Sequence, residues 1–326
     1  MQITSNCIIN GLPEEIYHGD PSPLLDGFKD SASLSSSTAK DCVESTMLEA
    51  RANINRLNPN KKRESGTEAM NLGELAHDFI LCGGESKFEV APVDAWRSND
   101  AKAMKADILN RGKIPLNLST QGIIDDIRNM KTRLFEQLAD DRTGFHDILL
   151  NGKPEQSGFA FDGKIWNRAR FDWLDGNHEN LIVDYKTTGI PLAQWKRNDL
   201  WNEKFYQEIH YRRVLDAIRD KESAPATFCF VLQQSYGEHL AEIIFLDASY
   251  EEQSRSRYDM GYHRFVEATK TGIWPGLPPY ATHACPPPWK LTGWEEDEVI
   301  AKEWAEQAKK EAQAPANEYR SVRAAG

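Results

Sequence analysis

One segment of the chain reads Leu181-Ile182-Val183-Asp184-Tyr185-Lys186-Thr187-Thr188-Gly189: a short apolar run, two charged residues two positions apart, and then a turn. The run predicts a buried β-strand that ends near Thr188. Because side chains alternate along a strand, Asp184 and Lys186 share the face opposite Val183 and Tyr185. Charge inside a sheet is costly unless it is paired or bound to a metal, so this strand is a candidate for a functional site.

The preceding segment, from Ile165 to Trp173, alternates in the same way and predicts a neighbouring strand. Alternation puts Arg168, Arg170 and Asp172 on one face, with Ala169, Phe171 and Trp173 on the other. Two adjacent strands can then aim Asp172 and Asp184 at the same side, and carboxylate oxygens suit Mg²⁺ or Mn²⁺. An Asp-x-Lys triplet is common by itself, however, and a surface ion pair is the competing interpretation.

A helix over about residues 65–82 adds a possible third ligand. Gly73 and His77 are one helical turn apart. Because Gly73 has no side chain, the helix can approach a sheet closely beside the imidazole. A single helical histidine is more often a packing or surface residue than a ligand, so both interpretations remain open.

The order of predicted elements indicates an α/β fold. Helices are expected at 31–57, 65–82, 121–139, 202–219, 250–271 and 295–314, and strands at 159–161, 165–173, 181–186, 227–232 and 240–246. We expect residues 1–30 to be a loop-rich lead-in and 31–290 a single domain. Residues 291–326 should form a charged helix and, from Pro315, a disordered tail.

Composition narrows the class of protein. The 326 residues are 40% hydrophobic and 27% charged, which is ordinary for a globular chain. No apolar run could span a membrane, and residues 1–6 lack the features of a signal peptide. The five cysteines form no CxxC pair, which favours a reducing, cytoplasmic setting and argues against an iron–sulfur cluster. A net charge of −11 excludes a passive DNA-coating protein but allows a nuclease with a local basic groove.

Four short motifs occur in an order typical of one enzyme superfamily: Gly73-x-x-x-His77, Arg170-x-Asp172, Asp184-Tyr185-Lys186-Thr187 and Gln207-x-x-x-Tyr211. In this order the chain resembles the RecB-like PD-(D/E)XK nucleases, and more narrowly the RecE (exonuclease VIII) family and its phage relatives. The narrower likeness rests on Leu34-Ser35-Ser36-Ser37, Arg168-x-Arg170-x-Asp172, Trp274-Pro275-Gly276 and Pro288-Trp289. It covers about residues 15–290. It implies a PD-(D/E)XK core, a mixed central β-sheet flanked by helices, with an N-terminal helical elaboration.

The resemblance also implies a set of site residues. His77, Asp172, Asp184 and the backbone carbonyl of Tyr185 would bind Mg²⁺, with Mn²⁺ able to substitute, and Lys186 would be catalytic. Glu155 is a candidate for an outer-shell carboxylate on the segment before the first strand.

For several further residues, two interpretations stay open. Arg170 could contact a phosphate or form an ion pair that tethers Asp172. Gln207 and Tyr211 would border the site and the DNA, although Tyr211 could equally pack a helix on the sheet. Ser35 and Ser37 could cap a helix or, through its N-terminus, hold a 5′-phosphate.

The activity implied is a 5′-to-3′ exodeoxyribonuclease that degrades one strand of double-stranded DNA and leaves 3′ overhangs for phage-type recombination. A RecT-like single-strand annealing protein is the expected partner, and a ring-shaped homo-oligomer the expected assembly, in the bacterial host cytoplasm if the chain is phage-encoded. The chain has no Walker motif, so the activity would not need ATP. The alternatives are a helicase-coupled or Cas4-like nuclease of the same superfamily, and a non-catalytic DNA-end-binding module.

Overall fold

The computed structural model describes residues 3–19, 32–58, 61, 68–82, 88–139, 144–175, 180–219, 222–277, 286 and 288–313. The chain divides into two units, Met1–Gly276 and Leu277–Gly326. The second unit contains helix α11 (Pro288–Gln313). The end of the predicted domain at residue 290 stays a prediction. The predicted tail from Pro315 lies outside the described residues. No helix in the described part combines the length and apolar character needed to cross a membrane.

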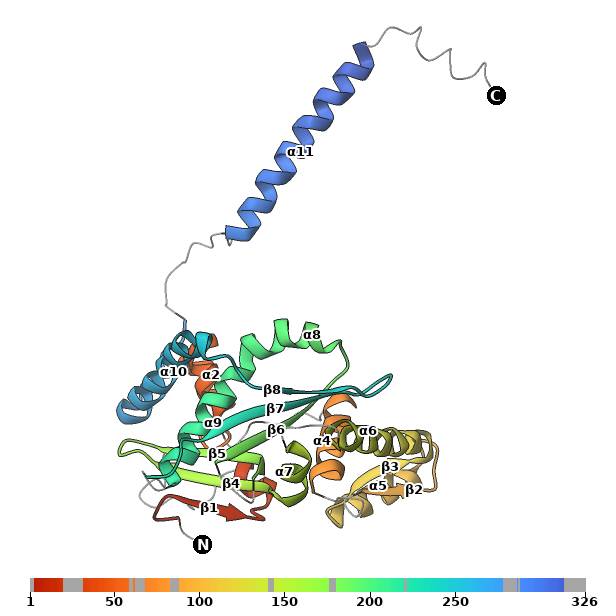
Figure 1. Cartoon of the computed structure of the whole chain (residues 1–326), viewed down its shortest axis with the longest axis vertical. Coiled ribbons are helices and arrows are strands. Elements are labelled where there is room, and N and C mark those ends of the chain that lie inside the picture. The colour runs from red at the N-terminus through yellow and green to blue at the C-terminus, as the bar shows by residue number, and fades with distance from the viewer. Residues whose placement is uncertain are drawn as a thin grey trace. The chain divides into compact units, whose positions relative to one another are not determined.

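The first unit is built on a six-stranded mixed sheet with the order β1-β4-β5-β6-β7-β8 (Figure 1). Its strands are β1 (Cys7–Asn10), β4 (Lys153–Phe161), β5 (Trp166–Leu174), β6 (Leu181–Thr188), β7 (Thr227–Gln234) and β8 (Ala241–Ile244). Only β6 and β7 are parallel, and the other neighbours are antiparallel. The prediction of an α/β protein with a mixed central sheet flanked by helices is confirmed at this level.

The parallel pair explains the long helical crossover after β6. Parallel strands cannot be joined by a tight turn, so the chain must return along the sheet. It does so through α8 (Leu192–Trp195), a π-helix (Lys196–Lys204) and α9 (Phe205–Ile218). The sequence predicted this helix only from residue 202. It missed the π-helical part, which is charged and lacks a clear apolar period.

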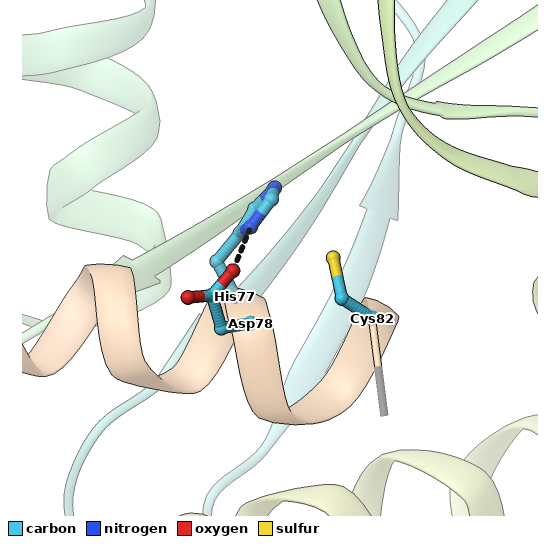
Figure 2. A group of neighbouring side chains, drawn as sticks. All are labelled: His77, Asp78 and Cys82. Atoms are coloured by element: carbon cyan, nitrogen blue, oxygen red, sulfur yellow. Dashed lines mark ion pairs between the residues drawn. The ribbon is translucent and has the colours of Figure 1, made fainter. Parts of the chain in front are cut away.

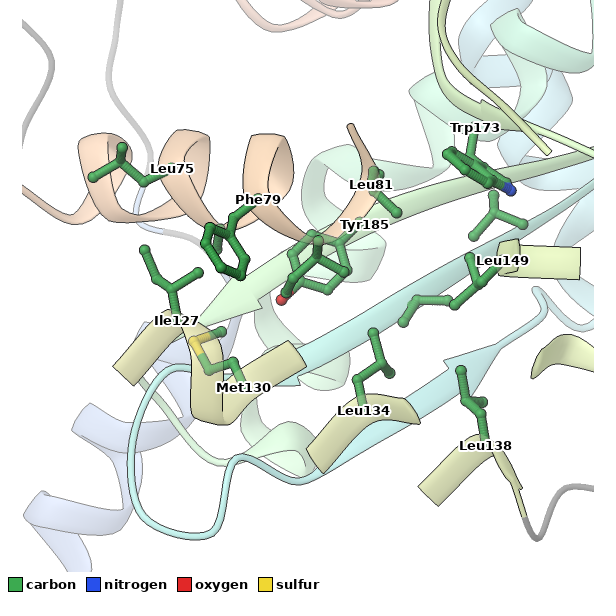
Figure 3. Packing of buried hydrophobic residues seen from close by; sticks show 14 of the residues in the cluster. Leu75, Phe79, Leu81, Ile127, Met130, Leu134, Leu138, Leu149, Trp173 and Tyr185 are labelled. Carbon is green, nitrogen blue, oxygen red and sulfur yellow. The ribbon is translucent and has the colours of Figure 1, made fainter. Parts of the chain in front are cut away.

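Apolar side chains from helices pack on both faces of the sheet. On one face, α4 (Glu68–Leu81), α6 (Gln121–Ala139) and α7 (Phe145–Asn151) cover β6 and β7, and Figure 3 shows the cluster they form. Ile127, Met130 and Leu134 lie at helical spacing along α6 and are fully buried there, as the periodicity predicted. On the other face, α9 packs Val214 and Leu215 into a second cluster.

The remaining elements surround this core. They are α1 (Glu14–Gly19), α2 (Ser36–Glu44), α3 (Met47–Asn53), α5 (Asn99–Asn110), α10 (Glu251–Thr271), the short 3-10 turns Leu118–Thr120 and Ala248–Tyr250, and a two-stranded parallel sheet of β2 (Phe88–Ala91) and β3 (Ile114–Asn117). Strand β1 and helix α1 fall in the segment predicted to be a loop-rich lead-in. The Gly-Pro and Pro-rich sequence there concealed a short edge strand that pairs with β4.

Two short motifs that supported the family resemblance lie at the end of the first unit and in the second. The carbonyl of Pro275 accepts a hydrogen bond from the amide of Leu48, and Trp274 packs edge-on against Phe265. Pro288 begins α11, and the side chains of Pro288 and Trp289 lie outside what the structure describes.

Candidate active site

Strands β5 and β6 pair over a short distance only, and the candidate residues follow the point where they part. The two strands share the pairs Trp173–Val183 and Leu174–Ile182. From there β5 continues along β4, whereas β6 pairs with β7 over its whole length. The backbone of Leu34 takes the place beside β5: its amide donates to the carbonyl of Trp166 and its carbonyl accepts from Arg168, both at 2.8 Å. Asp172 and Asp184 are therefore the first residues of β5 and β6 beyond their paired part.

The ladder between β4 and β5 is interrupted at the same level. It pairs Pro154 with Trp173 and Gln156 with Phe171, and it omits Glu155 and Asp172 between them. Glu155 has a φ of 54°, a left-handed conformation that residues other than glycine seldom adopt. The pairs on either side place Glu155 opposite Asp172, inside strand β4 rather than before the first strand as the sequence suggested.

The alternation of side chains along β5 also differs from the prediction. Ala169 and Phe171 pack in the cluster under α9, as expected for one face. Trp173 was predicted on that face too, but it packs in the cluster under α4 and α6. A strict period of two cannot account for a strand whose ladder is broken in the middle.

His77 reaches this point from helix α4. Its Nε2 atom lies 3.3 Å from Oε1 of Glu155 and 3.5 Å from Oδ2 of Asp172, and its side chain is 16% exposed. A Cβ atom added to Gly73 would lie 3.2 Å from Oγ1 of Thr187, tighter than nearly all real Cβ contacts. The predicted close approach of this helix to the sheet is therefore present, and it depends on Gly73.

The opposite side of the same imidazole faces residues of its own helix. Figure 2 shows Asp78 and Cys82 beside His77 on α4. The Nδ1 atom of His77 lies 4.0 Å from Oδ1 of Asp78, and the three ligand-type atoms lie within 4.8 Å of one another. A carboxylate on this side can orient the ring while Nε2 faces the carboxylates of the sheet.

A second group lies around Asp184, which is fully buried. Its two oxygens are contacted by the ammonium of Lys186 and the side-chain amide of Gln207. Lys186 also lies 4.0 Å from Oδ2 of Asp172, and that oxygen accepts a hydrogen bond of 3.1 Å from the amide of Tyr185. Asp172 thus links the His77–Glu155 group to the Asp184–Lys186–Gln207 group.

Electrostatics differ between the two aspartates. Burial raises the pKa of Asp172, but His77 and Lys186 outweigh burial and hold it below its usual value. For Asp184, burial and the neighbouring negative charge of Asp172 raise the pKa to about 7, despite Lys186. Burial lowers the pKa of His77, yet Asp172 and its other acidic neighbours raise it to about 10. The protonation of each of these groups therefore depends on the charges of its neighbours in the site.

The donor atoms fit a hard divalent metal. His77, Glu155 and Asp172 each offer one ligand atom, and these atoms lie within 4.8 Å of one another. Two ligands at right angles around Mg²⁺ would be about 3 Å apart, close to the distances observed from Nε2. Nε2 of His77 is buried and faces the carboxylates of Glu155 and Asp172. The carboxylates suit Mg²⁺ or Mn²⁺, and the imidazole is a ligand that Zn²⁺ or Fe²⁺ also takes.

The predicted metal ligands do not all lie in one group. His77 and Asp172 lie together as expected, and Glu155 lies beside both. Asp184 contacts Lys186, whose ammonium also lies near Asp172. To find the position of Glu155 from the sequence, the strand predicted at Phe159 would have to be extended back to residue 155. It would then have to be paired with the strand that contains Asp172. The phenol of Tyr185 donates to Gln233 at 2.7 Å, so its side chain serves the core.

The predicted supporting residues Arg170, Gln207 and Tyr211 make different contacts. Arg170 forms an ion pair with Glu155, not with Asp172, and also donates to the carbonyl of Leu12 at 2.9 Å. Gln207 contacts the site directly through Asp184. Tyr211 is buried edge-on against the ring of Phe171, at 5.4 Å between centroids, and its hydroxyl also hydrogen-bonds the side chain of Gln207.

The serine cluster caps helix α2. The hydroxyl of Ser35 accepts from the amide of Thr38 at 3.2 Å, and it lies 3.0 Å from the hydroxyl of Ser37. Ser35 is thus the N-cap residue, as one of the two interpretations predicted.

The chain has a weak structural likeness to a known protein. No protein-family model matches the chain, and no curated protein matches its sequence. Among solved structures, the chain is similar to that of a "Putative exonuclease" from Eubacterium rectale, with a TM-score of 0.49 and 12% sequence identity. The likeness covers 80% of this chain and 92% of the other. The geometry of the site bears on function independently of this likeness.

Proposed function

We propose that the chain is a metal-dependent exodeoxyribonuclease of the RecE-like PD-(D/E)XK type, which degrades one strand of double-stranded DNA from its 5′ end. One observation carries the proposal: His77, Glu155 and Asp172 converge where β5 and β6 part, next to the buried Asp184–Lys186 pair. A hard cation beside a protonated lysine can activate a water molecule and stabilise the charge that develops when a phosphodiester is hydrolysed.

Each residue has a distinct part in this chemistry. A bound Mg²⁺ would polarise the scissile phosphate and lower the pKa of the attacking water. Burial lowers the pKa of Lys186, but Asp184 and Asp172 raise it above the usual value, so its ammonium keeps its proton. That ammonium can stabilise the charge that develops on the phosphate oxygens. Gln207 fixes the carboxylate of Asp184, and the amide of Tyr185 fixes that of Asp172.

The test is digestion of a linear duplex with and without Mg²⁺. We expect loss of one strand from its 5′ end in Mg²⁺ or Mn²⁺ and none in EDTA. A folded protein that binds DNA ends but never cleaves them in either metal would make the chain a DNA-end-binding module and contradict the proposal.

The polarity of digestion involves the start of helix α2. We propose that Ser35 and Ser37 receive a terminal 5′-phosphate at the helix N-terminus, in addition to their capping contacts. Ser37→Ala should then reduce digestion of 5′-phosphorylated ends more than that of 5′-hydroxyl ends. An equal loss on both ends would leave these serines with capping alone.

The assembly follows from the conflict between charge and substrate. With a net charge of −11, the protein must concentrate its basic side chains where DNA binds. A ring-shaped homo-oligomer would do so by facing them into a channel, and its 3′-overhang product would pass to a RecT-like annealing protein in the host cytoplasm. Light scattering should show an oligomer, with processive digestion that weakens steeply with salt. A monomer that digests distributively would rule out the ring.

A further inference from the structure

A carboxylate holds two lysines together at the junction of helix α2 and the π-helix. Nζ of Lys40 lies 2.7 Å from Oε2 of Glu203, and Nζ of Lys204 lies 2.5 Å from Oε1 of the same residue. The three side chains are 27%, 36% and 25% exposed for Lys40, Glu203 and Lys204. Each oxygen of one anion is thus matched by one ammonium, and solvent can reach all three groups.

This Lys40–Glu203–Lys204 cluster lies next to the candidate active site. Lys204 precedes Gln207 by one helical turn, about 4.5 Å along the helix axis, and Gln207 donates to Asp184. The negative charge of Glu203 acts on the ammonium of Lys186. In α2, Lys40 is one turn beyond Ser37.

The ion pairs are not needed to hold the two helices together. Ala39 and Cys42 of α2 pack with Phe205 and Tyr206 of α9 in one buried apolar cluster. Partly exposed ion pairs contribute little to stability, because solvent screens them and ordering long side chains costs entropy. Burial raises the pKa of Glu203, but Lys204 and Lys40 lower it to about 2, so this side chain stays ionised near neutral pH. Only a competing anion can replace it on the lysines.

We propose that Lys40 and Lys204 form a binding site for a phosphate of the DNA strand, and that Glu203 occupies this site until DNA displaces it. The proposal rests on the nuclease function proposed above. A phosphate presents two or more anionic oxygens, as the carboxylate does, and lysine ammonium groups are common phosphate contacts. Glu203 then holds both lysines in place in the free protein and weakens the binding of DNA.

The chain offers a matched control. Glu242 of β8 accepts an ion pair of 2.7 Å from Lys196 of the same π-helix, and the two side chains are 39% and 37% exposed. Glu203→Gln and Glu242→Gln change the net charge equally. Glu203→Gln releases Lys40 and Lys204, whereas Glu242→Gln releases Lys196.

The experiment measures binding without cleavage. The full chain is titrated against a blunt duplex labelled at a 3′ end, in EDTA, and fluorescence anisotropy is followed over a salt series. Glu203→Gln should bind about threefold to tenfold more tightly than wild type, with Glu242→Gln within about twofold of it. Lys40→Met and Lys204→Met should each weaken binding and reduce the slope of log Kd against log salt by about one. Circular dichroism checks that each variant is folded.

The outcomes separate the two proposals. If wild type binds the duplex but Glu203→Gln binds no more tightly than Glu242→Gln, the phosphate site is wrong and the nuclease proposal stands. If wild type binds no duplex in EDTA, the phosphate site is wrong, and digestion of the duplex in Mg²⁺ decides the nuclease proposal separately. Comparing 5′-phosphate with 5′-hydroxyl duplexes locates the phosphate: a larger defect of Lys40→Met on phosphorylated ends indicates the terminal group, and an equal defect an internal phosphodiester.

Discussion

The imidazole Nε2 of His77 lies 3.3 Å from Oε1 of Glu155, a residue whose backbone has a φ of 54°. A left-handed non-glycine residue costs about 1–3 kcal/mol and persists where the surroundings enforce it. Here the ion pair with Arg170 and the interrupted ladder with β5 hold Glu155 in that conformation. The strained residue is also the one that adds a carboxylate to His77 and Asp172, which links the strain to the site.

Glu155→Gln should weaken metal binding. The amide keeps the shape of the side chain but removes the negative charge, so we expect affinity for Mn²⁺ to fall about tenfold to 100-fold. Titration calorimetry on the folded protein measures this directly. Glu89→Gln, at a surface carboxylate paired with Arg111, is the control and should leave metal affinity unchanged. Unchanged affinity in Glu155→Gln would place this residue outside the metal site.

Asp184→Asn and Lys186→Met should abolish cleavage without unfolding the protein. Asp184 is buried beside the like charge of Asp172, so its ionised carboxylate serves the chemistry and not the stability of the sheet. We expect activity to fall by at least about 10³-fold, while the thermal midpoint changes by only a few degrees. Activity is followed by release of labelled nucleotides, and folding by circular dichroism. Substantial cleavage by a folded Asp184→Asn protein would exclude its assigned role.

Gly73→Ala should displace helix α4 from strand β6 and move His77 with it. The added Cβ would lie 3.2 Å from Oγ1 of Thr187, so the helix or the hydroxyl must shift by a few tenths of an ångström. We expect weaker metal binding and slower cleavage, with the fold retained. The double variant Gly73→Ala/Thr187→Ala removes the obstructing atom and should recover much of the loss.

The double-variant comparison isolates the contact itself. If the two substitutions act additively, the contact between helix and strand does not set the position of His77. Gly122→Ala is the control for helix propensity, because nothing lies within 4 Å of a Cβ atom at that position.

The sequence predicted those parts of the fold that a regular period controls. Strand β6 and helix α6 follow from alternation and helical spacing, as does the close approach at Gly73. The nearness of His77 to Asp172 was expected only from the resemblance to the nuclease family. What the sequence missed depends on irregular backbone. The position of Glu155, the reversal of Trp173 and the pairing of Arg170 with Glu155 all arise where the β4–β5 ladder is interrupted. A local break of this kind has no periodic signature.

The same limit applies to the crossover helix. A π-helix places side chains at a different angle from an α-helix, so the relation of Glu203 and Lys204 to Lys40 could not be derived from spacing. By contrast, the sequence suggested capping for Ser35, because that role depends only on residues three positions apart.

His210 should make the stability of the protein depend on pH. It is fully buried: its Nε2 donates to the carbonyl of Arg168 at 2.9 Å, so its Nδ1 must accept from the hydroxyl of Tyr258 at 2.7 Å. This arrangement requires the neutral ring. Burial lowers the pKa of His210 to about 4, although the hydrogen bond to Arg168 opposes it.

The unfolded chain therefore binds the proton first as pH falls. Its histidine has a pKa of about 6.5, so the stabilising contribution of neutral His210 is complete above that pH and is lost progressively down to about pH 4. The two pKa values correspond to about 3 kcal/mol of unfolding free energy. Urea unfolding at pH 7 and pH 4.5 should thus show a larger loss in wild type than in His210→Gln, whose amide does not titrate. Equal losses in the two proteins would mean that His210 is not held neutral, because all other acidic groups are common to both.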